Sequence, residues 1–186
     1  MKPIVTTLED GHRWLRVADP RWEDPLDPSY AATRGGRWNP PNSFPTLYLN
    51  EDIWTARGQV VALLRGSPVT PDDLDPGFDL VVATLPRSQD VADAIGEPGL
   101  EALGLPPTYP RHGNGRPVRH DVCQPIGEAV KDVGLRGIHA RSAATENGTG
   151  KELAWFPARE TSIATLEDRL PFVNWWYRSA ETGDLG

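Results

Sequence analysis

Residues 46–68 read TLYLNEDIWTARGQVVALLRGSP, and this stretch decides the expected fold class because it joins a short strand directly to a helix. The first four residues, 46–49, predict the strand. Asn50 is expected to cap the helix, with acidic residues in the first turn, where negative charge is favourable. Apolar residues then recur at helical spacing, and a Gly-Ser-Pro run from residue 66 ends the predicted helix.

The segments on both sides of this unit predict more short strands and few helices. Strands are expected over 12–18, 80–85, 137–140, 153–156 and 162–166, and short helices over 90–95 and 121–133. Gly, Pro and Asp predict loops over 19–45, 69–79 and 96–119. Strands and helices do not alternate regularly. We therefore expect one compact α+β domain over residues 1–186, a mixed sheet of short strands with flanking helices.

The composition narrows the function classes. A length of 186 residues fits one domain, at about 150 residues per domain. The net charge of −7 argues against a nucleic-acid-binding protein, and the single cysteine, Cys123, excludes an internal disulfide or a cysteine zinc cluster. No apolar run approaches the roughly 18 residues of a membrane span, and residues 1–10 lack the apolar core of a secretory signal. We expect a cytoplasmic protein with neither nucleic acid nor membrane as a partner.

The stretch Arg-Gly-Gly-Arg-Trp-Asn-Pro-Pro at 34–41 carries the densest chemistry. Gly35 and Gly36 allow the backbone to approach a ligand closely, and Arg37 can hold a phosphate in a bidentate fork. Trp38 can stack on a ring, and Asn39 offers an amide donor and acceptor. Together these residues suit a nucleotide with a diphosphate. The alternative is an ordinary tight turn, with Trp38 filling the core and Arg37 in a surface ion pair.

Several motifs occur in an order that resembles the RES domain family. They are Arg16, Gly-Gly-Arg-Trp-Asn at 35–39, Thr-Leu-Tyr-Leu at 46–49, Gly-Ile-His-Ala-Arg-Ser-Ala at 137–143 and Leu-Ala-Trp-Phe at 153–156. The resemblance is strongest over residues 12–158. It implies a fold like that of ADP-ribosyltransferases. It also implies a toxin that degrades NAD+ by phosphorolysis or hydrolysis, with inorganic phosphate as a co-substrate in the first case and with no cofactor. The implied partners are NAD+ and a cognate antitoxin protein, while formation of a homo-oligomer stays open.

The family is named for an arginine, a glutamate and a serine, and the resemblance assigns two of them directly. Arg37 matches the arginine, and Ser142 matches the serine that would orient the attacking phosphate or water. Arg16 resembles a second arginine, which would hold the diphosphate together with Arg37. Tyr48 is expected to pack against the nicotinamide or its ribose. The turn residues Gly35, Gly36, Trp38 and Asn39 would form the floor of the NAD+ site.

The sequence departs from the family at the glutamate. Counting eleven residues beyond Tyr48, where the family has this residue, leads to Gln59. A glutamine can hold a ribose hydroxyl, but it offers no charge to an oxocarbenium-like centre. Asp52 lies on the same helix face and is a possible substitute. Two alternatives to a RES-type NAD+-cleaving enzyme therefore stay open, namely a weakened NAD-binding or regulatory module and a protein ADP-ribosyltransferase.

The remaining candidates are weaker. His112, His120 and His139 lack a metal-ligand spacing, so no metal site is expected. Cys123 is expected to be a packed thiol. The basic stretch 111–119 is expected to be a solvated loop, and the alternative is that it gates a pocket or approaches the substrate phosphates. The aromatic run 175–177 is expected either to pack in the core or to form an antitoxin or self-association surface.

Overall fold

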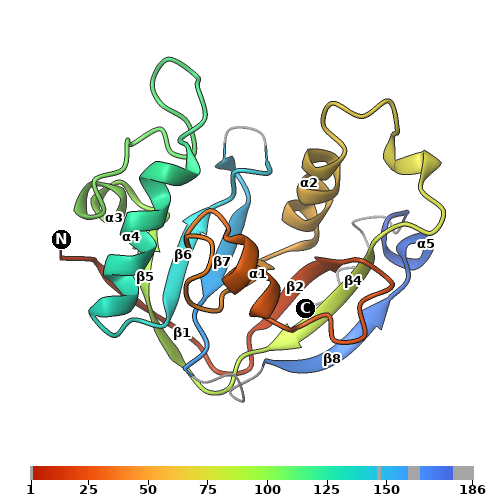
Figure 1. Cartoon of the computed structure of the whole chain (residues 1–186), viewed down its shortest axis with the longest axis horizontal. Coiled ribbons are helices and arrows are strands. Elements are labelled where there is room, and N and C mark those ends of the chain that lie inside the picture. The colour runs from red at the N-terminus through yellow and green to blue at the C-terminus, as the bar shows by residue number, and fades with distance from the viewer. Residues whose placement is uncertain (1, 146–147, 159–163, 178–186) are drawn as a thin grey trace.

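An eight-stranded mixed sheet organises the chain (Figure 1). The computed structural model describes residues 2–145, 148–158 and 164–177. The strand order is β1-β5-β6-β7-β3-β2-β4-β8. The strands span Val5–Leu8 (β1), Arg13–Ala18 (β2), Leu47–Asn50 (β3), Asp79–Thr84 (β4), Gln89–Ala94 (β5), Gly137–Arg141 (β6), Lys151–Trp155 (β7) and Thr165–Leu170 (β8).

Helices cover this sheet in two groups (Figure 1). In the first group α3 packs on β5 and α4 on β6, while in the second group α2 packs on β2 and β3, and α5 on β4. The short helix α1 lies between β2 and β3 in the sequence. The helices span Ser29–Arg34 (α1), Ile53–Leu63 (α2), Glu97–Ala102 (α3), His120–Asp132 (α4) and Phe172–Trp175 (α5), with a 3-10 turn at Pro71–Asp73. Among the described residues, no helix is long and apolar enough to cross a membrane.

The strand register decides which side chains lie together at the candidate functional site. β5 and β6 run parallel, joined by the crossover that contains α3 and α4, and the other paired strands are antiparallel. Central β3 pairs with β7, so that Tyr48 lies opposite Ala154 and Asn50 opposite Glu152. Alternation along β3 sends Tyr48 to the core beneath α3 and α4, and sends Leu47 and Leu49 to the core on the opposite face.

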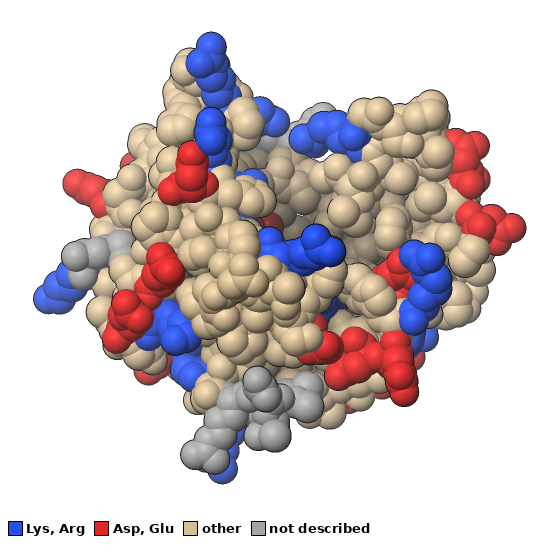
Figure 2. Space-filling model, viewed as in Figure 1, with Lys and Arg blue, Asp and Glu red and all other residues tan. Residues whose placement is uncertain are grey.

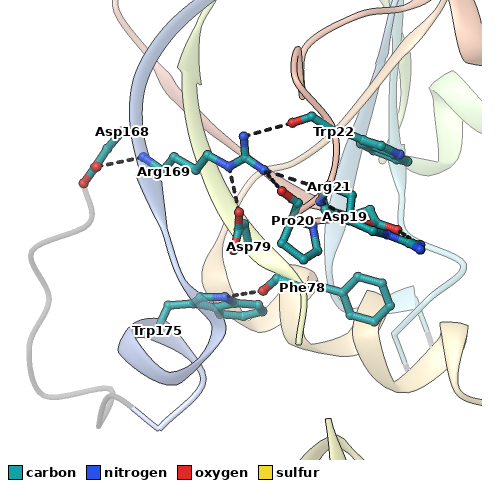
Figure 3. A network of polar contacts seen from close by, with 9 residues as sticks. All are labelled: Asp19, Pro20, Arg21, Trp22, Phe78, Asp79, Asp168, Arg169 and Trp175. Carbon is teal, nitrogen blue, oxygen red and sulfur yellow. Dashed lines mark hydrogen bonds and ion pairs between the residues drawn. The ribbon is translucent and has the colours of Figure 1, made fainter. Parts of the chain in front are cut away.

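One arginine ties the second half of the sheet to the loop after β2 (Figure 3). Arg169 on β8 donates its Nε–H to Asp79 on β4 over 2.7 Å. Its two terminal nitrogens donate to the carbonyl oxygens of Trp22 (3.0 Å) and Pro20 (2.9 Å). Nearby, the indole N–H of Trp175 donates to the carbonyl oxygen of Phe78 over 2.9 Å, which fixes α5 against β4.

The predicted strand–helix unit is confirmed, as are the strands near 12–18, 80–85, 137–140 and 153–156 and the helix over 121–133. The predicted helix over 90–95 is wrong, because this segment pairs with β1 and β6 as strand β5. The predicted cap is also wrong. Asp52, not Asn50, caps α2 and accepts a hydrogen bond from the backbone N–H of Thr55 over 2.7 Å.

Four further segments differ from the sequence expectation. The predicted loops over 19–45 and 96–119 contain α1 and α3, and β1 was not predicted. The predicted strand over 162–166 begins at 165 as β8, and positions 162 and 163 lie outside the described residues. Of the aromatic run 175–177, Trp175, the last residue of α5, is fully buried in the cluster that contains Ala56 and Val60 of α2, so it packs in the core.

Candidate functional site

The turn over residues 35–39 is held rigidly against the sheet. Gly35 has a φ of 75°, and a Cβ atom there would lie 2.7 Å from the backbone nitrogen of Pro41. The backbone N–H of Gly36 donates to the carbonyl oxygen of Asn39 over 2.9 Å. Gly36 also packs against the ring of Tyr48, and a Cβ atom on Gly36 would collide with that ring. Both glycines are therefore required by close approach within the protein.

Tyr48 and Asn39 stabilise this turn through hydrogen bonds. The Tyr48 hydroxyl accepts the backbone N–H of Trp38 over 2.9 Å and donates to Asn39 Oδ1 over 2.8 Å. The Asn39 side-chain amide donates to the carbonyl oxygen of Ala31 over 2.7 Å. Burial raises the pKa of Tyr48, so its hydroxyl stays protonated. Trp38 and Asn39 are fully buried, whereas Tyr48 is half-buried, and all three hold the turn through these hydrogen bonds, so their contact with a substrate stays a prediction.

Helix α4 supports the turn from the other side. The Gln124 side-chain amide donates to the carbonyl oxygen of Gly36 over 3.0 Å. Gly127 packs directly on the backbone carbonyl of Trp38, in a space that no larger residue fits. Arg37, at the centre of the turn, donates from Nη1 to the carbonyl oxygen of Val118 over 2.9 Å. Its guanidinium is thus fixed from the protein side while the residue stays partly exposed.

A carboxylate that the sequence did not single out lies near this guanidinium. Glu152 on β7 accepts a hydrogen bond from the Ser142 hydroxyl over 2.9 Å. It lies deep in the protein, yet part of the residue's surface remains open to solvent. Burial raises the pKa of Glu152, against the opposing influence of Arg37 and the Ser142 hydrogen bond.

Two buried polar atoms lie in the same environment without a hydrogen-bond partner among the described residues. They are the Nε1 of Trp38 and the hydroxyl oxygen of Tyr109. The Trp38 N–H is directed toward Glu152 and lowers the pKa of that carboxyl, and the Tyr109 hydroxyl is directed toward Arg37, which opposes the burial that raises the pKa of Tyr109. Burial alone would lower the pKa of Arg37, but Tyr109, Glu152 and Cys123 together raise it. The guanidinium is therefore charged.

The structure places Gln59 beside this set. Its Oε1 accepts from the Asn50 side-chain amide over 2.7 Å, and Asn50 pairs with Glu152 across β3 and β7. Gln59 is partly exposed. Asp52 is exposed, and its carboxylate binds both the N–H (2.7 Å) and the hydroxyl (2.9 Å) of Thr55. The expectation that Asp52 replaces a missing carboxylate is thus not supported, because its carboxylate caps α2.

Ser142, which the resemblance expects to orient the attacking phosphate or water, is enclosed within the protein. It is fully buried, and its hydroxyl donates to Glu152 while accepting the backbone N–H of Ala144 over 3.2 Å. Both hydrogen-bonding functions are therefore used within the protein. As placed, Ser142 orients a carboxylate, which counts against its expected contact with an attacking phosphate or water.

Arg16 lies apart from Arg37. Its neighbour Leu15 pairs with Asn50, so alternation along β2 directs Arg16 to the opposite face of the sheet. The guanidinium lies 5.4 Å from the centre of the Trp22 ring and faces the acidic residues Asp24 and Asp27. Together with residues of α1 it lines a separate cavity of about 740 Å³. This placement counts against the expectation that Arg16 and Arg37 hold the same diphosphate.

The remaining polar candidates do not form a metal site. Among the described residues, no group of three or more His, Cys, Asp or Glu side chains could hold a metal ion. His139 instead makes a 2.6 Å contact with Glu51. Cys123 is fully buried, as expected of a packed thiol, and burial raises its pKa. His112 and His120 are exposed.

Figure 2 shows one face of the molecule, in the same view as Figure 1. The surface is hollowed at its centre, between the part that carries α3 and α4 and the part that carries α2, and Lys and Arg side chains lie around the hollow. The two sides are bridged beneath it by β6, β7 and β3. Lys and Arg side chains around a hollow favour the approach of an anionic ligand.

Comparisons with known proteins agree with this architecture. A model of the RES domain family matches residues 12–174. Among solved structures, the chain is similar to one from the crystal structure of the M. tuberculosis MbcT–MbcA toxin–antitoxin complex. The TM-score is 0.70 and the identity 22%, over 89% of this chain and 86% of that chain. No curated protein matches. Because the family model spans most of the sequence, the chain belongs to the RES domain family.

Proposed function

We propose that this protein cleaves the nicotinamide–ribose bond of NAD+. The observation that carries the proposal is the Arg37 guanidinium, fixed by the Val118 carbonyl and the rigid turn, near the partly buried Glu152 carboxylate. A charged arginine in a partly desolvated site binds a diphosphate strongly. Membership in a family whose members act on NAD+ makes this nucleotide the best-supported substrate.

The reaction needs positioning and electrostatics more than a cofactor. Nicotinamide leaves as a neutral molecule, and positive charge develops on the ribose in an oxocarbenium-like transition state. Fixed negative charge next to that ribose lowers the barrier. Water as the acceptor gives ADP-ribose, and inorganic phosphate gives its 1″-phosphate.

The test is nicotinamide release by the purified protein, with and without inorganic phosphate. We expect release by the natural protein and a loss of about 100-fold in kcat/KM for Arg37→Ala, the size expected for a charge-stabilising group. Arg34→Ala is the matched control, because Arg34 is an exposed arginine on neighbouring α1. Equal activity in Arg37→Ala and Arg34→Ala would contradict the assignment of the site.

A second candidate function is an NAD-binding or regulatory module without turnover. It is favoured by Gln59, which is uncharged and already bonded to Asn50. Calorimetry that detects NAD+ binding without nicotinamide release would support it. Transfer of labelled ADP-ribose from NAD+ to a protein would instead support a protein ADP-ribosyltransferase.

We also propose that the protein acts as the toxin of a toxin–antitoxin pair in the cytoplasm. The structural likeness to a chain from such a complex supports this role. Induced expression should then stop growth and deplete cellular NAD+, and Arg37→Ala should relieve both effects. Co-purification with the product of an adjacent gene would identify the antitoxin, and gel filtration of each species would give the oligomeric state.

A further inference from the structure

We propose that Glu152, on strand β7, is the catalytic carboxylate of this chain and supplies the negative charge that Gln59 lacks. The inference rests on the proposed function and adds a residue to it. The charge would come from the centre of the sheet instead of from helix α2. Four observations lead to this assignment.

The first observation is position. Glu152 lies opposite Asn50 across β3 and β7, and the Asn50 amide contacts Gln59 over 2.7 Å. The carboxylate and the glutamine therefore border the same small region from two elements. Glu152 is deep but partly open to solvent, so a ligand in the cleft can reach it.

The second observation is orientation. The Ser142 hydroxyl donates to the carboxylate over 2.9 Å, and Ser142 is itself held by the backbone N–H of Ala144. The backbone N–H of Ala143 also contributes to the stabilisation of the charged form of Glu152. A carboxylate fixed in this way needs no reorganisation when charge develops on a substrate. Ser142 thus acts as a positioning residue.

The third observation is the electrostatic setting. Arg37 provides a nearby positive charge on one side, and the other titratable groups facing Glu152 are Tyr48, Tyr109 and Cys123. Burial raises the pKa values of all three, so they remain neutral and do not compete for the role of the anion. Glu152 is the acidic residue among these groups.

The fourth observation is unused hydrogen-bonding capacity. The Trp38 indole nitrogen and the Tyr109 hydroxyl are buried near this carboxylate with no partner among the described residues. Buried polar atoms without partners are costly and rare in proteins. The Trp38 N–H is directed at Glu152 and the Tyr109 hydroxyl at Arg37, so the space between these two charges is a place where a polar ligand completes the network.

The chemistry balances with Glu152 in this role. The bond between ribose C1″ and the nicotinamide nitrogen breaks, and its electron pair leaves with neutral nicotinamide. Ionised Glu152 stabilises the positive charge that develops on the ribose. When water attacks C1″, Glu152 accepts the proton that the water loses and later releases it to solvent. When a phosphate dianion attacks, its oxygen forms the new bond and no proton has to be removed.

The experiment compares nicotinamide release by Glu152→Gln, by Gln59→Ala and by the natural protein. Glu152→Gln keeps shape and removes charge, so we expect kcat to fall about 100-fold or more with little change in KM. Gln59→Ala should lower kcat far less. The matched control is Glu128→Gln, an exposed glutamate on α4 that should leave kcat unchanged. Thermal melting establishes that each variant is folded.

A second measurement uses the natural protein alone and therefore does not depend on the folding of any variant. In the natural protein, kcat should rise with pH along an acid limb that lies above the ordinary carboxyl pKa of 4.5, because burial raises the pKa of Glu152. A flat profile from pH 4.5 to 7, or full activity in folded Glu152→Gln, overturns the inference while leaving the proposed function intact. A natural protein that releases no nicotinamide overturns both.

Discussion

Replacing Glu51 by glutamine should weaken the fold in a way that depends on pH. Glu51 follows β3 and joins it to two other strands: its carboxylate contacts His139 Nε2 on β6 over 2.6 Å and Lys151 Nζ on β7 over 2.9 Å. The hydrogen bond to His139, opposed by burial and aided by Lys151, lowers the pKa of Glu51 from 4.5 to about 2. Glutamine keeps the shape and removes the charge.

The magnitude follows from this pKa. A fall from 4.5 to about 2 sets a ceiling of about 3 kcal/mol on the stability that the ionised carboxylate contributes. The Glu51 side chain is 25% exposed and that of Lys151 42%, so solvent screening reduces the expected loss to about 2 kcal/mol.

The sign is set by the direction of the pKa change. Because the folded-state pKa is lowered, the contribution is complete above about pH 5.5 and is lost as the pH falls from 4.5 toward 2. The difference between natural protein and Glu51→Gln should therefore be largest at pH 7. It should drop below half of that value by about pH 3.

The assay is urea unfolding followed by tryptophan fluorescence at pH 7, 5, 4 and 3. Glu128→Gln, an exposed replacement of the same kind, controls for the general effect of removing one negative charge. The reasoning is refuted if the difference between the natural protein and Glu51→Gln stays constant from pH 7 to pH 3, or if it grows as the pH falls.

Three further replacements test the supports of the turn and the sheet. Tyr48→Phe should cost about 2–3 kcal/mol in urea unfolding, because the backbone N–H of Trp38 and the Asn39 side chain lose a buried partner. Gly127→Ala should lower stability by about 2 kcal/mol or more and weaken NAD+ binding measured by calorimetry, since the added methyl displaces the Trp38 backbone. Arg169→Ala should cost about 2–3 kcal/mol, seen as a lower melting temperature, with nicotinamide release at 20 °C unchanged.

Local sequence patterns were sufficient for the elements whose neighbours in space are also neighbours in sequence. The strand–helix unit of β3 and α2 is an example, because turn residues and helical spacing define it alone. The segment 89–94 is a counter-example: its alanines and alternating polar residues fit a short helix equally well. Pairing with β1 and β6, which no local pattern contains, makes it a strand.

The candidate site was only partly predictable for the same reason. The motif at 35–39 identified the turn and Arg37, and the alternative that Trp38 fills the core is confirmed by its full burial. Glu152 was missed because its role depends on register. Alternation places it on the same face as Ala154, but only the pairing of β7 with β3 brings it opposite Asn50. The sequence offered one signal for Glu152, namely a charged residue directly before the apolar run at 153–156.

The complete burial of Ser142 has a consequence for inhibitor chemistry. Reagents that acylate or phosphonylate reactive serines need an exposed, nucleophilic hydroxyl, whereas this one is enclosed and engaged with Glu152. Such reagents should not label Ser142. A reversible compound is the better starting point, one that offers an anion to Arg37 and a cationic or N–H donor group to the carboxylate below it.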